Sequence, residues 1–348
     1  MLSQVLETEG SLDALLPGQT GEENSELLAA AVEWSWAVWA EADRLGNLPL
    51  SGEQMTRGLE LSQNPVYICG AHHSGTTFLR NCLTGQSGLV VLPSKSAWFA
   101  NIEFRLRMLP EEDQLAFLCT EWLRRLAAPD HESSWWMLGR STPSASPYVA
   151  FARYLMSWWT IASQMDNEQW PHIAVVLAYA TCTNNLGAKL WVDKTPTSER
   201  FLTRLWQEMP KAKVIHIIRE PGAVINSRKL MEPSVAMHNA LIELEMSFRI
   251  AFEVSQSQDP GYLLIRYEDI CDNLPAVIKN LDSFLNIGIT KVSGPPAAVK
   301  FEMLSSMERQ LVASFIGPIA SKLNYPTARV SFLRKHFLRL KYALPLFI

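Results

Sequence analysis

A loop of small residues that joins an apolar run to a helical pattern has the composition of an anion-binding site. The apolar run covers residues 66–69, the loop extends from Gly70 to Gly75, and Thr76 and Thr77 open the helical pattern. Backbone N–H groups at a helix start have no partner within the helix, and the helix dipole favours negative charge there. Small residues also let the backbone approach an anion closely. The stretch therefore predicts a binding loop for a phosphate-like group, with a plain strand-to-helix turn as the alternative.

The same loop lacks the cation of the common nucleotide-binding loop. Its frame matches G-x-x-x-x-G-K-[ST] in the two glycines and the closing hydroxyls, but Thr76 stands where the lysine would be. In the common loop that lysine reaches the outer phosphates and the hydroxyl holds magnesium. A loop without the lysine suits one phosphate-like group better than a triphosphate with a metal, so we expect no metal at this site.

Residues that could bind a ligand or take part in catalysis also follow other strand-like runs. The runs and the residues that end them are 189–193 before Lys194, 214–218 before Arg219, and 262–267 ending in Tyr267. Ser227 lies eight residues after Arg219. Ligands bind outside the carboxyl ends of the strands in open parallel sheets, so we expect these residues and the loop to form one site.

The strand-like runs alternate with helical patterns along the chain. A further short run covers residues 89–92, and helical periodicity is seen over 26–45, 106–126 and 149–165. This alternation predicts an α/β fold, a P-loop-like doubly wound parallel sheet flanked by helices. A composition of 48% hydrophobic and 19% charged residues over 348 positions suits a globular enzyme with a substantial core.

The order of the patterns divides the chain into three parts. We expect a helical lead-in over residues 1–63, a catalytic α/β domain over 64–325 and a tail helix over 326–348. Within the domain, residues 94–185 form a helical insertion rich in tryptophan, which we expect to cover the acceptor site. Most of its tryptophans suit helix packing; the alternative is an acceptor pocket walled by indoles, with His131 or Glu132 at its rim.

Composition also limits the partners and the compartment. The formal net charge of −4 argues against general affinity for nucleic acid or anionic membranes. Five scattered cysteines without C-x-x-C spacing indicate reduced thiols and no zinc site. The N-terminus shows no signal-peptide pattern, and the longest apolar run, 173–180, is far shorter than the ~20 residues of a membrane span. We therefore expect a cytoplasmic protein without a membrane span; no oligomeric state is favoured.

Three blocks in fixed order resemble a known family. They are His73-Ser74-Gly75-Thr76-Thr77, Arg219-Glu220-Pro221 with Ser227, and Arg266-Tyr267-Glu268-Asp269-Ile270. Together they resemble the sulfotransferases that use 3′-phosphoadenosine 5′-phosphosulfate (PAPS). The segment Trp-Val-Asp-Lys-Thr-Pro at 191–196 is similar to the branch that contains bacterial enzymes and protein-tyrosine sulfotransferases. By motif order the resemblance covers roughly residues 64–290.

The resemblance implies a role for each motif residue. His73 and the Ser74, Gly75, Thr76 and Thr77 that follow it would cradle the 5′-phosphosulfate. Arg219 and Ser227 would bind the 3′-phosphate, for which an arginine fork is well suited, and Tyr267 would lie near the adenine. Lys194 matches by position a lysine that the family places at the sulfate. A fixed cation there would stabilise charge that builds on the leaving phosphate oxygen.

The general base does not carry over from the family. Small-molecule members have a lysine directly before the Ser-Gly-Thr-Thr stretch and a histidine two places after the transferring lysine, where this chain has His73 and Pro196. Protein-tyrosine members use a carboxylate just after the second strand, and the corresponding position here is close to Ser94. We consider His73 the candidate group at the reacting sulfate and Glu103 the carboxylate alternative. Their structural alternatives are a neutral imidazole that fills the loop and a solvated helix face.

These observations predict a metal-independent sulfotransferase. It would transfer a sulfonate from PAPS to a hydroxyl, or to an amine or carbamoyl nitrogen, of a small-molecule acceptor such as a secondary metabolite. The alternative is a kinase-like protein or a nucleotide-binding module with a degenerate P-loop. The missing lysine and the Arg219–Ser227 pair favour the sulfotransferase.

Overall fold

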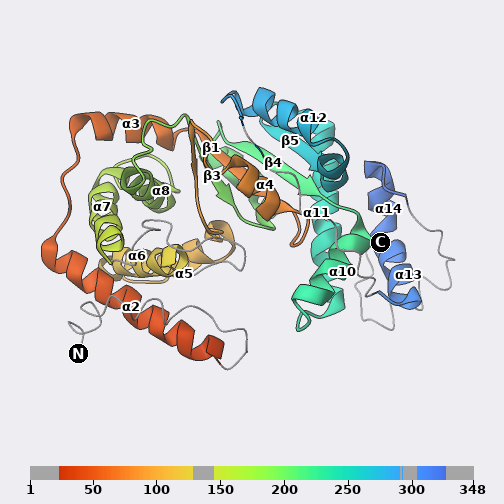
Figure 1. Ribbon diagram of the computed structural model, residues 1–348, viewed down its shortest axis with the longest axis horizontal. Helices are drawn as coiled ribbons and strands as arrows, with labels where there is room; N and C mark the ends of the chain where they lie inside the picture. Colours follow the sequence, from red (N-terminus) through yellow and green to blue (C-terminus); the bar gives the residue numbers. More distant parts are fainter. Residues whose placement is uncertain (1–22, 128–144, 291, 293–303, 327–348) are drawn as a thin grey trace. The chain divides into compact units, whose positions relative to one another are not determined.

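The structure, a computed structural model, describes residues 23–127, 145–290, 292 and 304–326 (Figure 1). It comprises two compact units. The first contains Met1–Pro65, Gly88–Asp193 and Gln207–Pro210, and the second contains Val66–Ser87, Lys194–Trp206 and Lys211–Ile348. His131 and Glu132, the candidate rim residues of an acceptor pocket, and all but the first residue of the predicted tail helix lie outside the described residues. The expected domain boundaries stay a prediction.

The described strands form a five-stranded sheet in the order β2-β3-β1-β4-β5. They are β1 (Pro65–Cys69), β2 (Leu89–Val91), β3 (Leu190–Lys194), β4 (Lys213–Ile218) and β5 (Tyr262–Arg266). The pairs β1–β4, β2–β3 and β4–β5 are parallel. The predicted α/β class and its parallel sheet are thus confirmed, and each predicted strand lies within one residue of its observed bounds. Every residue of β1 and β3 is buried, and the continuous apolar run of β1 is typical of a strand in a parallel sheet that is covered on both faces.

Helices make up most of the first unit. They are α2 (Glu23–Leu45), α3 (Gly52–Ser62), a π-helical turn (Trp98–Ile102), α5 (Glu103–Arg107), α6 (Glu111–Ala127), α7 (Ser146–Ala162) and α8 (Trp170–Cys182). In Figure 1, α7 and α8 lie side by side, and α2 packs against α6 and α7. The helical periodicity over 106–126 is divided between two helices, the end of α5 and α6. Pro110 separates α5 from α6 because it has no N–H to continue the first helix, and its carbonyl accepts from the Asp113 amide at the start of the second.

Aromatic side chains of the first unit form much of its interior. The His172 ring stacks on Trp98 with centroids 5.1 Å apart and meets Trp191 edge-on at 5.4 Å. Burial lowers the pKa of His172 to about 4, so its ring is neutral at pH 7. Trp158 is also fully buried, and its indole N–H donates to Thr181 Oγ1. Packing is therefore the role of these tryptophans, while Trp135 and Trp136 lie outside the described residues.

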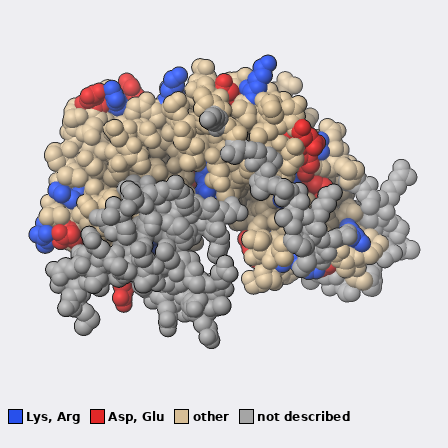
Figure 2. Space-filling view, viewed as in Figure 1, with Lys and Arg blue, Asp and Glu red and all other residues tan. Residues whose placement is uncertain are grey.

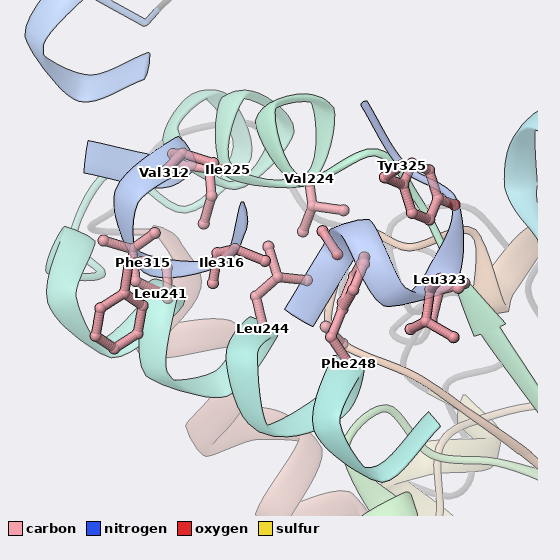
Figure 3. Close-up of a cluster of buried hydrophobic side chains, with 14 of the residues drawn as sticks. Val224, Ile225, Leu241, Leu244, Phe248, Val312, Phe315, Ile316, Leu323 and Tyr325 are labelled. Atoms are coloured by element: carbon pink, nitrogen blue, oxygen red, sulfur yellow. The ribbon is translucent and has the colours of Figure 1, made fainter. Parts of the chain in front are cut away.

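The second unit combines β1, β4 and β5 with the remaining helices. These are α4 (Thr76–Leu83), a 3₁₀ turn (Ser198–Phe201), α9 (Leu202–Glu208), α10 (Pro221–Met231), α11 (Met237–Ser257), α12 (Tyr267–Leu285), α13 (Ser306–Phe315), α14 (Gly317–Ala320) and a 3₁₀ turn (Ser321–Leu323). Both α11 and α12 pack on β4 and β5. Figure 3 shows apolar side chains of α10, α11 and the C-terminal helices facing one another, with Leu244 and Phe248 of α11 within the cluster. This core fixes α10 and α11, which carry several of the polar groups described below, among them Ser227, Arg228 and Glu243.

The strand order sets where a ligand site is expected. Strands β2 and β3 follow β1 on one side of the order, and β4 and β5 follow it on the other. The loops after β1 and β4 therefore leave the sheet at its topological switch point, where open α/β sheets bind their ligands. Both loops belong to the second unit.

Charge is dispersed on the face that Figure 2 shows. Lys and Arg side chains lie there in small groups beside Asp and Glu, with wide uncharged areas between them. Within the described residues, no helix is long and apolar enough to cross a membrane. All five cysteines are free thiols.

Candidate active site

The loop after β1 has a backbone that few residue types tolerate. Gly70, His73 and Gly75 all have positive φ, at 138°, 64° and 105°. A Cβ at Gly75 would lie 2.4 Å from Cδ2 of Tyr267, so a side chain would clash as well as strain the backbone. The ring of Tyr267 therefore closes one side of the loop, and only glycine fits against it.

The start of α4 is left open toward this loop. Its N-cap is Gly75, which offers no side-chain oxygen to the first amides of the helix. Ser74 is 1% exposed, and its buried hydroxyl has no hydrogen-bond partner among the described residues. A buried hydroxyl without a partner costs free energy unless a ligand or water meets it. Uncapped amides and an unpartnered Ser74 hydroxyl form a cradle that fits a phosphate-like group.

The start of α10, after β4, is capped by the chain itself. The Glu220 carboxylate accepts hydrogen bonds from the amides of Gly222 and Ala223, and Pro221 occupies the first turn. Amides at this helix start are therefore already used, and of the two helix starts α4 alone is open to an anion. The Glu220 amide in turn donates to Glu268 Oε1, 2.8 Å away, which ties the start of α10 to the start of α12.

Arg219 links three parts of the site. Its Nη1 donates to the backbone oxygen of His73 at 3.2 Å. Its guanidinium carbon lies 4.5 Å from the centre of the Tyr267 ring, a cation–π geometry. The Tyr267 ring thus touches both the Gly75 backbone and the Arg219 side chain, and burial raises the pKa of its hydroxyl. Arg219 is held over the loop by a stacked ring on one side and a carbonyl on the other.

Lys194 brings a second cation to the loop from the end of β3. It is only 4% exposed, and its Nζ lies 3.3 Å from Thr77 Oγ1 in the first turn of α4. The next residue along, Thr195, donates its amide to the carbonyl of Ile68 in β1. The resemblance places a lysine at the sulfate, and here the lysine amine reaches the hydroxyl beside the open helix start.

His73 points toward α10. Its Nε2 lies 3.2 Å from Glu232 Oε1, and its Nδ1 lies 3.4 Å from Ser227 Oγ. Burial lowers the pKa of His73, and the nearby Glu232 carboxylate offsets part of that shift. Both ring nitrogens thus face groups on and just after α10.

A carboxylate and an arginine anchor the neighbouring His72. Glu243 Oε1 accepts from the amide of His72 at 2.9 Å and lies 2.8 Å from its Nδ1. Arg228 Nη1 pairs with Glu243 Oε2 at 2.7 Å, and Arg228 Nε lies 3.2 Å from Glu232 Oε2. Burial would raise the pKa of Glu243, but the bonds from His72 and Arg228 prevail and lower it to about 2. The loop is thereby fixed to α10 and α11 by ionised groups.

A buried polar network lies at the base of the loop. Glu199 is 2% exposed and accepts from the amide of Gly70 at 3.0 Å. His216, beside Cys69 in the β1–β4 register, shares hydrogen bonds with Ser247 Oγ at 3.0 Å and Tyr262 OH at 2.8 Å. Burial lowers the pKa of His216 to about 3 and raises that of Glu199.

The same network contains metal-type ligand atoms. Those of Cys69, Glu199 and His216 lie within 4.8 Å of one another. Both imidazole nitrogens already have hydroxyl partners, and burial raises the pKa of the Cys69 thiol well above its usual value, which disfavours the thiolate that a metal needs. We interpret the group as a hydrogen-bonded support for the loop, and the expectation of a metal-free enzyme stays a prediction.

Glu103 belongs to the first unit. It opens α5, is 4% exposed, and accepts hydrogen bonds from Arg107 at 3.1 and 2.9 Å. Arg107 also pairs with Glu168 at 2.7 Å. The solvated helix face considered as its alternative is wrong, because the side chain is buried and paired. Its role as a base stays a prediction.

The second unit unites the other predicted site residues. Direct contacts connect Lys194 to Thr77, Arg219 to His73 and Tyr267, Tyr267 to Gly75, and Ser227 to His73. The sequence analysis did not identify four residues that support the loop: His72, Glu199, Glu232 and Glu243. Only His72 had a local signal, its place inside the loop, while the three carboxylates reach the loop from distant segments.

Comparisons with known proteins identify a family for the sequence. Residues 65–291 match the model of the sulfotransferase family. Among solved structures, the chain is similar to the sulfotransferase domain of the Synechococcus PCC 7002 olefin synthase, with 21% identity over 82% of this chain and 96% of that one and a TM-score of 0.43. It is also similar to the sulfotransferase domain from the curacin biosynthetic pathway, with 19% identity over 81% and 98% and a TM-score of 0.42.

A third similar structure is a sulfotransferase from Alicyclobacillus acidocaldarius, with 14% identity over 81% of this chain and 96% of that one and a TM-score of 0.40. No protein of curated function matches the sequence. The matched residues 65–291 span well over half of the chain and include all the loop, β3, β4 and β5 residues described above. The chain belongs to the sulfotransferase family.

Proposed function

We propose that this sulfotransferase uses PAPS as its donor and transfers the sulfonate to a hydroxyl of a small-molecule acceptor, such as a secondary metabolite. An amine or carbamoyl nitrogen is the second acceptor class. The observation that carries the proposal is the meeting of an open helix start with two cations of separate origin, Lys194 from β3 and Arg219 from β4. Each cation suits a different anionic part of one nucleotide.

The residues of the second unit fit the donor. The amides at the start of α4 and the unpartnered hydroxyl of Ser74 would hold the 5′-phosphosulfate. Arg219 and Ser227 would hold the 3′-phosphate, with the arginine fork as the main contact. Tyr267, whose ring already stacks against Arg219, would lie near the adenine. These assignments follow the family resemblance and require no metal ligand.

Lys194 is suited to act on charge that develops during transfer. When bound, PAPS supplies the sulfonate and a phosphate oxygen that gains negative charge as the sulfonate leaves. The buried Lys194 amine beside Thr77 is fixed before the reaction, so it needs no rearrangement to stabilise that charge. Burial at 4% exposure also excludes water from the amine and strengthens its electrostatic effect.

The rival function is a kinase-like or nucleotide-binding module. It would need a cation at the loop for the outer phosphates and a magnesium ion on the loop hydroxyl. Lys194 does bring a cation to Thr77, which is the specific observation in its favour. The same contact occupies the hydroxyl that would hold magnesium, and Arg219 and Ser227 would then have no phosphate to bind. Sulfonate transfer explains all of these residues.

The test is a transfer assay with PAPS and a panel of hydroxyl- and amine-bearing acceptors, read by mass spectrometry as the gain of one sulfonate. Parallel reactions contain EDTA or ATP with magnesium in place of PAPS. We expect sulfonate transfer that chelation does not change and no phosphoryl transfer from ATP. Phosphoryl transfer that EDTA abolishes would establish the kinase-like alternative instead.

A further inference from the structure

The imidazole of His73 lies among the groups assigned to the 3′-phosphate, and this inference rests on the donor proposed above. Its Nδ1 is 3.4 Å from the hydroxyl of Ser227, and its own carbonyl accepts from Arg219. The groups that would hold the 5′-phosphosulfate, the Ser74 hydroxyl and the amides at the start of α4, come after it in the sequence. The family resemblance places His73 at the 5′-phosphosulfate, but its imidazole lies beside Ser227, a residue assigned to the 3′-phosphate.

A carboxylate stands on the opposite side of the same ring. Glu232, 35% exposed on its side chain, follows α10 and places Oε1 3.2 Å from His73 Nε2. A phosphate bound by Ser227 would then have a negative charge nearby, separated from it by the imidazole. Like charges on the two sides of one ring repel each other, and the repulsion costs more free energy in the partly buried setting of this site. A proton on His73 would remove that conflict, because the imidazolium donates to both neighbours.

We propose that His73 is a specificity-determining residue that recognises the 3′-phosphate by taking up a proton when the donor binds. The ring would bridge Glu232 through Nε2 and the phosphate through Nδ1. A neutral imidazole can donate from only one of its nitrogens, whereas the protonated ring donates from both. The proton comes from solvent, and the 3′-phosphate binds as its dianion.

The charges around His73 are consistent with this switch. From α10 and its end come Arg228 and Glu232, which pair with each other, and Ser227. From the loop comes His72, held by Glu243 of α11, and from the end of β4 comes Arg219, whose described contact with His73 is made to the backbone carbonyl. Burial outweighs Glu232 and keeps the pKa of His73 below its ordinary value in the free protein. Without donor the His73 ring is therefore neutral at pH 7.5, and a bound phosphate dianion would favour the protonated ring instead.

Calorimetry of the product nucleotide 3′-phosphoadenosine 5′-phosphate (PAP) tests the inference without any acceptor. Titrations at pH 7.5 in two buffers of different ionisation enthalpy give the number of protons taken up. We expect about one proton per PAP bound and none for AMP, which lacks the 3′-phosphate. Between pH 7 and 9, where phosphate is already a dianion, the Kd for PAP should rise by up to about tenfold per pH unit, while that for AMP stays level.

Two substitutions of His73 separate charge from shape. His73→Gln should abolish the proton uptake and leave PAP binding weak and level with pH. His73→Lys, which supplies a permanent cation, should bind PAP about as tightly at pH 9 as at pH 7. Unchanged AMP binding shows that each variant is folded. Glu232→Gln keeps His73 but removes the repulsion between the Glu232 carboxylate and the 3′-phosphate. PAP binding by this variant should depend less on pH than PAP binding by the wild type.

The outcomes distinguish this inference from the proposed function. Tight PAP binding without proton uptake, or uptake that persists in His73→Gln, overturns the inference and leaves the donor intact. Equal affinities of the wild type for PAP and AMP at pH 7 overturn both. Proton uptake that is specific to PAP and lost with His73 supports both.

Discussion

Arg219 and Lys194 both bring a positive charge to the loop after β1, but they come from different strands. Lys194 ends β3 and reaches Thr77 in α4, whereas Arg219 follows β4 and stacks on Tyr267. Two cations at opposite parts of one loop suit a ligand with two anionic groups. Their effects should therefore separate into recognition of the donor and acceleration of the reaction.

For Arg219 we predict a loss of donor recognition. Arg219→Ala should weaken PAP binding by about 2–5 kcal/mol, the usual cost of removing one partner of a buried charge-assisted contact. AMP binding should change far less, because the 3′-phosphate is absent. Calorimetry with both nucleotides measures the difference, and Arg219→Lys, which keeps the charge without the fork, should fall between. Equal losses for PAP and AMP would mean that Arg219 does not bind the 3′-phosphate.

For Lys194 we predict a loss of turnover with retained binding. Its charge acts on the transition state more than on the bound donor, so Lys194→Ala should lower kcat about 10²–10³-fold. The Kd for PAP should stay close to the wild-type value. Lys194→Met, which keeps the buried aliphatic stem, controls for the cavity left by alanine. If PAP affinity falls in step with kcat in both variants, Lys194 is a binding residue and its role in transfer is refuted.

At the scale of elements, the loop depends on supports from both sides. The Tyr267 ring limits it at Gly75, and the Glu199 carboxylate holds it at Gly70. Tyr267 begins α12, and Glu199 lies in the 3₁₀ turn that precedes α9. Neither support needs a ligand to be present, so the open start of α4 is formed in advance.

Gly75 offers a test of this preformed geometry. Gly75→Ala should destabilise the fold and weaken PAP binding, since the methyl group meets Tyr267 at 2.4 Å and the residue has a φ of +105°. Gly85→Ala is the matched control, because Gly85 has a φ of +80° but no atom of the described residues within 4 Å of the position that an added Cβ would take. Denaturant unfolding should show a loss of about 1–3 kcal/mol from backbone strain in both variants and a larger loss for Gly75→Ala. Similar unfolding and PAP binding in the two variants would show that Tyr267 does not confine the loop.

Glu199 offers a test of the buried network. Burial raises its pKa in the folded protein, so folding favours the protonated form. The stabilisation that a raised pKa provides is complete at pH values below the pKa of the unfolded chain. It is lost as the pH rises through the pKa of the folded protein. Glu199→Gln, which keeps the shape without the charge, should therefore gain stability relative to wild type as pH rises above about 4.5. Urea unfolding at several pH values measures this gap, and parallel profiles for the two proteins would contradict it.

The sequence predicted the strands and the loop better than the side-chain contacts between segments that are distant in the chain. The strands and the loop were recoverable because continuous apolar runs, glycines and hydroxyls are local signals. Pro110 was equally local, yet its break was overlooked because the apolar period continues past it. Glu232 and Glu243 were not predictable as partners of His73 and His72, since they meet them across 159 and 171 positions. The direction of the His73 ring toward α10 depends on its positive φ, which the residue type alone does not fix.

At the scale of the whole chain, the predicted residues divide between the two units. The residues assigned to the donor all belong to the second unit, and Glu103 belongs to the first. Donor binding should therefore be insensitive to Glu103. The nitrogens of His73 face groups on and just after α10, and Glu103 stays the predicted carboxylate alternative for the base that accepts the proton of the acceptor.

We predict that Glu103→Gln lowers kcat about 10²–10⁴-fold, the range typical of a lost general base, and leaves the Kd for PAP unchanged. Glutamine keeps the volume of the buried side chain and still accepts a hydrogen bond from Arg107. Arg107→Gln is the matched control, because it breaks the ion pair with Glu103 but keeps the carboxylate. That variant should retain most of the turnover. A kcat for Glu103→Gln that equals the one for Arg107→Gln would reduce Glu103 to a structural partner of Arg107. The transfer would then need no base from this side chain, as expected for an acceptor that is already strongly nucleophilic.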